Sequence, residues 1–224
     1  MIASGEDGIS VVETVLAAAL GLVILSAALL TLERAFTANR QVFDRVEASQ
    51  RARVAMDWMT RELRSSVCPD PFTAALISGS ANSVSFFADL GDGTKPAVKY
   101  TLTYDQSKRT ISESRYDGTG ASPSTTWPTT PTSTRVLIAN VVTAGSEPAF
   151  RFNAFDTASP PRPTIVLPTP LTAAGVASAS RITMTFSALP TGRSTQSPLV
   201  TTLQDQVDLR SADPNQPKPA PQCT

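Results

Sequence analysis

The sequence predicts an α+β protein in which a long N-terminal helix packs on an antiparallel β-sheet domain. Three observations support this fold class. Residues 14–32 form an uncharged apolar run, and residues 33–67 contain no proline or glycine and are rich in helix-forming residues. After Pro71, proline, serine and threonine increase and short runs of alternating apolar and polar residues appear. A helix followed by several strands separated by turns is typical of an α+β domain.

The apolar run of nineteen residues is about long enough to cross the hydrocarbon core of a membrane as a helix. Glu13 stands directly before it. A charge at the edge of such a segment is costly, so a functional role is the default hypothesis for this carboxylate. Residues 9–32 are therefore expected to form a transmembrane helix with a functional acidic residue, Glu13, in its N-terminal part.

An amphipathic helix is predicted over residues 33–67, and no breaker separates it from the membrane segment. Together the two segments would make one rod of about 90 Å. The apolar stripe lacks a sustained heptad of Leu, Ile and Val, so we expect a sheet and not a coiled coil as its partner. Its residues, spaced mostly by three, four and seven, are Leu32, Phe36, Phe43, Val46, Ala52, Ala55, Met56, Met59, Leu63 and Val67.

A β-rich domain is predicted over residues 68–210, followed by a Pro-rich tail over residues 211–224. A turn at residues 105–109 joins two alternating runs into a hairpin. The expected strands are residues 83–87, 98–104, 110–116, 136–142, 150–155, 181–186 and 199–210.

The composition argues against several classes of site. There is no histidine, which excludes Ser-His-Asp and Cys-His catalysis, and two cysteines are too few for a four-ligand zinc site. We expect no catalytic residue, no metal and no cofactor. From residue 68 onward, twelve basic residues face eleven acidic ones, so the charge indicates no nucleic-acid partner.

Two local motifs are expected to be structural. Asp89–Thr94 has the look of a calcium loop, but the twelfth position counted from Asp89 is Tyr100 and not glutamate, so we expect a turn. Trp127 lies in a Thr- and Pro-rich loop, and we expect it to hold that loop on the domain and not to recognise a partner. Trp58, beside the helix stripe, is also expected to be structural.

Cys68 and Cys223 are the two cysteines of the chain and lie at opposite ends of the soluble region. We expect them to form one disulfide, which an extracytoplasmic compartment permits. Such a bridge would tie the helix end to the C-terminus and stabilise the fold by roughly 4–5 kcal/mol in the chain-entropy model. The alternative is two unrelated cysteines, one of them on a loose tail.

The residues Gly8-Ile9-Ser10-Val11-Val12-Glu13 resemble the type IV prepilin processing motif. In that family a dedicated peptidase cuts after the glycine, methylates the new N-terminus and requires glutamate at the fifth mature position. The resemblance implies a leader peptide over residues 1–8, cleavage between Gly8 and Ile9, and N-methylation of Ile9. It also implies that Glu13 acts in assembly by pairing with the N-terminal amine of a neighbouring subunit.

Two further segments, residues 51–64 and 206–210, are similar to the larger minor pilins and the minor pseudopilins of type II secretion systems. The resemblance implies a single-pass protein with an extracytoplasmic domain and a priming, tip or adhesion role in a filament. Its expected partners are the prepilin peptidase, other pilins or pseudopilins, an inner-membrane assembly platform and membrane lipid. The alternative is a membrane-anchored extracytoplasmic ligand-binding module with an uncleaved signal anchor.

Overall fold

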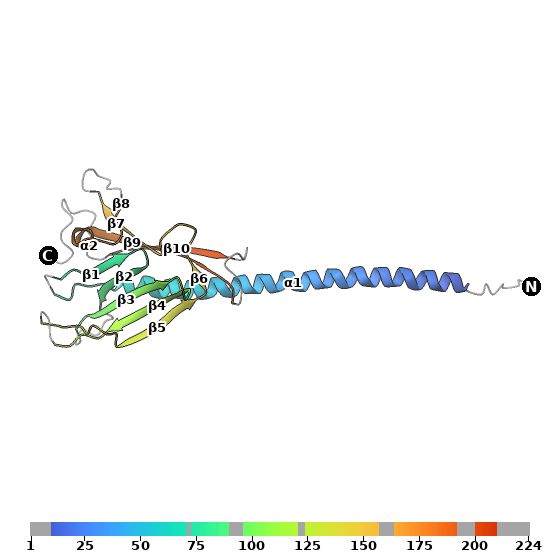
Figure 1. Ribbon diagram of the computed structural model, residues 1–224, viewed down its shortest axis with the longest axis horizontal. Helices are drawn as coiled ribbons and strands as arrows, with labels where there is room; N and C mark the ends of the chain where they lie inside the picture. The colour runs from blue at the N-terminus through green and yellow to red at the C-terminus, as the bar shows by residue number, and fades with distance from the viewer. Residues whose placement is uncertain are drawn as a thin grey trace, which may run out of the picture. The chain divides into compact units, whose positions relative to one another are not determined.

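The computed structural model describes residues 10–70, 73–89, 96–120, 124–156, 164–191 and 200–209. The chain divides into two compact units, the first ending at Asp44 and the second beginning at Arg45. Helix α1 runs from Val11 to Arg64 and contributes to both units (Figure 1). In the first unit it is the whole of the described structure.

Two antiparallel sheets make up most of the second unit, where the sequence predicts one. The first is a meander in the order β1-β2-β3-β4-β5, and the second has the order β10-β9-β7-β8, with β6 also paired to β9. The elements are β1 (Leu76–Ser80), β2 (Ser83–Ala88), β3 (Val98–Asp105), β4 (Thr110–Tyr116), β5 (Ser133–Ala139), β6 (Val141–Val142), β7 (Phe150–Phe155), β8 (Thr164–Val166), α2 (Ala173–Ser178), β9 (Ala179–Ala188) and β10 (Thr201–Asp208).

The chain passes from the first sheet to the second at Asn140. The single strand expected over residues 136–142 is wrong, because Asn140 adopts a left-handed conformation with φ of 58°. Asparagine tolerates this conformation better than most residues. Before it, β5 pairs with β4, and after it, β6 pairs with β9. One residue thus divides what the apolar pattern presents as one strand.

Most of the other predicted strands are confirmed. The hairpin of β3 and β4 has the register Lys99↔Tyr116 through Asp105↔Thr110, and β7 has the predicted bounds. Strand β9 is longer than expected, since it is paired on both sides, with β10 and with β7. The sequence analysis missed β1, β8 and α2, which lie in segments rich in Gly, Ser, Pro or Ala that carry little alternation.

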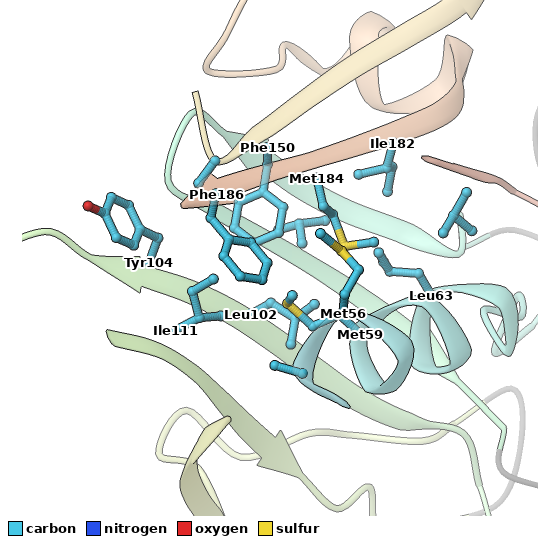
Figure 2. Close-up of a cluster of buried hydrophobic side chains, with 14 of the residues drawn as sticks. Met56, Met59, Leu63, Leu102, Tyr104, Ile111, Phe150, Ile182, Met184 and Phe186 are labelled. Atoms are coloured by element: carbon cyan, nitrogen blue, oxygen red, sulfur yellow. The ribbon is translucent and has the colours of Figure 1, made fainter. Parts of the chain in front are cut away.

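The core of the second unit lies between the end of α1 and the two sheets. Met56, Met59 and Leu63 of α1 are at most 4% exposed. Figure 2 shows their side chains directed towards side chains of both sheets: Leu102, Ile111, Phe150, Ile182, Met184 and Phe186. The prediction that α1 packs on a sheet through this stretch is confirmed.

The first part of the predicted stripe is not packed on a sheet. Phe36 and Phe43 are 58% and 73% exposed. They belong to the first unit, which contains no strand among its described residues. The helix also ends at Arg64 and not at Val67, because Ser66 forms a bridge with Ala88 and the Val67 N–H donates to the Phe87 carbonyl. The helix thus ends because the residues that follow Arg64 pair with β2.

Gly79 of β1 packs tightly against the neighbouring sheet. A Cβ atom at this position would lie 2.7 Å from Cε1 of Phe152 and 2.8 Å from Cδ1 of Leu171. Phe152 is fully buried and has no room to yield. We expect Gly79→Ala to lower the free energy of unfolding by about 1–3 kcal/mol, as overpacking does. Urea unfolding of the full chain in detergent measures this loss; Gly175→Ala, whose nearest contact would be 3.3 Å, is the control and should lose less.

Candidate functional site

The N-terminal part of α1 presents apolar side chains in every direction. Among the described residues, α1 is the helix that is long and apolar enough to span a membrane. Its most apolar window of 18 residues has a mean hydropathy of 2.6, and none of that window is buried. Leu20, Ile24 and Leu29 are 57%, 69% and 57% exposed. A helix that is apolar all round is typical of a segment covered by lipid or by other helices.

The hydroxyl groups of this segment are satisfied within the helix. Thr14, Ser26 and Thr31 each donate to the carbonyl four residues earlier, at 3.1, 2.7 and 2.8 Å. Such internal hydrogen bonds leave no hydroxyl donor that needs water. The segment therefore meets the requirement that a hydrocarbon environment places on polar groups.

Glu13 lies in the first turn of α1. The helix begins after Ser10, whose Oγ accepts from the Val12 N–H at 3.3 Å and whose carbonyl accepts from the Glu13 N–H at 2.9 Å. A carboxylate is favoured at this end of a helix by the helix dipole. The side chain is exposed, and none of the described residues forms an ion pair or hydrogen bond with it. A carboxylate in this setting is available to a cationic partner outside the described structure.

The other predicted site residues are only partly within the described structure. Gly8 and Ile9 lie outside the described residues, so cleavage and methylation there stay predictions. Cys68 is disulfide-bonded. Cys223, its predicted partner, also lies outside the described residues, and the pairing itself stays a prediction.

A polar cluster at the end of α1 was missed by the sequence analysis. Arg135 of β5 donates from Nε and Nη2 to the two carboxylate oxygens of Glu113 of β4, each at 3.0 Å. The Trp58 Nε1 donates to the same carboxylate at 2.9 Å. Arg135 and Arg61 lie over the Trp58 ring, with their guanidinium carbons 3.9 and 4.4 Å from its centroid. Glu113 and Arg135 are register partners, so the strand pairing was the one signal that would have revealed them.

No family model matches this chain, and no curated protein matches it. The chain itself presents two features that bear on its function: the exposed apolar helix with Glu13, and the folded second unit.

The structural role predicted for Trp127 is confirmed. Its Nε1 donates to the Ala97 carbonyl at 2.9 Å, and its ring lies against Phe87 with 4.5 Å between ring centroids. These contacts hold the loop on the first sheet. In the calcium-like segment only Asp89 is described, and residues 90–94 lie outside the described structure. The part of the chain that the structure describes contains no group of three or more Asp, Glu or Cys able to hold a metal ion.

Proposed function

We propose that this protein is a minor pilin or pseudopilin. It is made as an inner-membrane prepilin, cut between Gly8 and Ile9, methylated on Ile9, and assembled into a type IV pilus or a type II secretion-like filament. The observation that carries the proposal is the N-terminal part of α1, an exposed apolar helix with a carboxylate in its first turn. The second unit, which contains the C-terminal part of the same helix and the two sheets, would be the globular domain of such a subunit.

The apolar surface supports this proposal because exposed apolar area is costly in water, at about 25 cal/mol per Å². Lipid covers it before assembly, and the corresponding helices of other subunits cover it in the filament. Glu13 then sets the axial alignment of neighbouring subunits. Its carboxylate pairs with the methylated amine of Ile9 on a neighbouring subunit, and a buried charge without its partner costs about 3–5 kcal/mol. Misaligned subunits are disfavoured for this reason.

The second unit is the part that would distinguish a minor subunit. It contains two sheets and long connections, which is more structure than a repeating shaft subunit needs. In the proposed filament this unit lies outside the cytoplasm and selects neighbours, primes assembly, occupies the tip or presents an adhesive surface. The mechanism is assembly and not catalysis. The other partners are the prepilin peptidase and the inner-membrane assembly platform.

The N-terminal mass of the protein from its native membrane tests this proposal. We expect a chain that begins at Ile9 and carries one methyl group on its amine. A Gly8→Ala variant should keep its leader, and Gly21→Ala is the matched control, since a Cβ at Gly21 meets nothing within 4 Å. An uncut leader on the wild-type chain, in cells with an active peptidase, would contradict the proposal and favour the membrane-anchored binding module.

A further inference from the structure

Glu62 is a buried acidic residue that the proposed assembly function does not use. It lies on the face of α1 that packs in the second unit and is 2% exposed. Its Oε2 has no hydrogen-bond partner among the described residues. Its other oxygen, Oε1, is 4.0 Å from Nη2 of Arg135, which is beyond hydrogen-bond distance. A buried carboxylate that accepts so few hydrogen bonds destabilises the folded state when it is charged.

Arg135 offsets the charge of Glu62 only in part, because its hydrogen bonds to carboxylate oxygens go to another residue. Both of its hydrogen bonds to carboxylate go to Glu113, which also accepts from Trp58. Glu113 is 4% exposed, so a second buried carboxylate lies next to Glu62. Two carboxylates therefore share one guanidinium, and the arrangement favours ionisation of only one of them.

The remaining charges near Glu62 do not remove this imbalance. Arg115 is paired with Asp117 at 2.7 Å, and Arg61 lies over the Trp58 ring. Burial, together with the neighbouring Glu62, raises the pKa of Tyr100 to about 12, so its hydroxyl stays neutral. The groups that face Glu62 are thus Arg61 from α1, Tyr100 from β3, Glu113 and Arg115 from β4, and Arg135 from β5.

The net effect of these neighbours is to favour the neutral carboxyl. Burial, and then the charge of Glu113, raise the pKa of Glu62 to about 7, although Arg135, Arg61 and Arg115 act in the opposite direction. A cavity of about 280 Å³ adjoins the group, lined by Glu62, Glu113, Tyr100, Trp58, Arg115 and Arg135 among others.

We propose that Glu62 holds a proton in the buried cluster between α1 and strands β3–β5, and that loss of this proton loosens the packing of α1 on the first sheet. The second unit then has a built-in response to pH at the end of α1. This inference does not depend on the proposed filament function. It requires only the contacts within the second unit.

The sign of the pH effect follows from the direction of the shift. An acid whose pKa is raised on folding stabilises the folded state through its protonated form. This contribution is complete below about pH 4.5, decreases as the pH rises towards 7, and is lost above 7. The chain has no histidine, so few other side chains titrate in the same interval.

Urea unfolding of the full chain in detergent micelles, measured at pH 5 and pH 8, tests the proposal. We expect the folding equilibrium constant to fall at least about 10-fold from pH 5 to pH 8. Glu62→Gln, which resembles the protonated carboxyl in shape and charge, should remove most of this dependence. Glu47→Gln is the matched control on the same helix, since Glu47 is 55% exposed, and it should keep the dependence. A wild-type chain without pH dependence, or a Glu62→Gln variant that keeps it, would overturn the proposal.

A second measurement tests the proposal on the wild-type chain. Carboxyl ¹³C shifts of the wild-type chain, labelled at glutamate and titrated from pH 3 to pH 9, should show one glutamate with a midpoint near 7. In Glu113→Gln this midpoint should move to lower pH, because the like charge is gone and Arg135 is released. A titration in which every glutamate has an ordinary midpoint would overturn the proposal.

Discussion

Glu13→Ala is expected to lower filament incorporation about 100-fold or more while leaving the second unit folded. The loss of one partner from a charge pair in a low-dielectric setting costs about 3–5 kcal/mol, and each 1.4 kcal/mol corresponds to a factor of ten. The proposed partner is the amine of Ile9 on a neighbouring subunit. The measurement is the amount of the variant recovered in sheared or purified filaments, relative to its amount in the membrane.

Glu33→Ala is the matched control for this experiment. Glu33 is an exposed acid on the same helix, beyond the uncharged run, and should be tolerated. The urea midpoint of each variant reports whether its second unit is folded. Normal incorporation of Glu13→Ala, with an intact chain in the membrane, would contradict the registry role. Equal losses for both variants would also contradict it, since the effect would then belong to helix charge in general.

Leu63→Ala is expected to have the opposite phenotype, because it damages the second unit and leaves the apolar segment unchanged. Leu63 is fully buried on α1 and belongs to the core formed with both sheets. Truncation of a buried leucine removes apolar contacts and leaves a cavity, at a cost of about 2–5 kcal/mol. Urea unfolding of the full chain in detergent should show a lower free energy of unfolding with unchanged membrane recovery.

Val54→Ala provides the control for the core experiment. Val54 is on the same helix, nine residues before Leu63, and its side chain is 70% exposed. Substitutions at such surface positions change stability by about 0.5 kcal/mol or less. A Leu63→Ala variant that unfolds at the same urea concentration as Val54→Ala would show that the end of α1 does not contribute to the core as the structure indicates.

Local patterns were sufficient for part of the fold. The β3–β4 hairpin was predictable because Tyr100, Leu102 and Tyr104 alternate with polar residues and a short turn follows. In the same way, a long stretch without Pro or Gly was enough to predict α1. These signals act between residues that are close in the chain, so they can be read without knowing the rest of the structure.

The burial of α1 could not be read in this way. Phe36 and Phe43 are as apolar as Met56 and Met59, and spacing placed all of them on one stripe. Of these four residues, Met56 and Met59 are buried, because described strands of both sheets pack against that part of the helix. The position of Asn140 in the chain likewise gave no sign that its left-handed conformation divides β5 from β6.

The sequence by itself determined that the chain has a long apolar helix, that Glu13 stands at its edge, and that strands follow. Each of these depends on composition or periodicity over neighbouring residues. The tertiary structure alone decided which part of α1 is buried, how the strands divide into two sheets, and that Glu62, Glu113 and Arg135 meet. Desolvation and charge pairing depend on which distant segments pack together, and no local pattern records that choice.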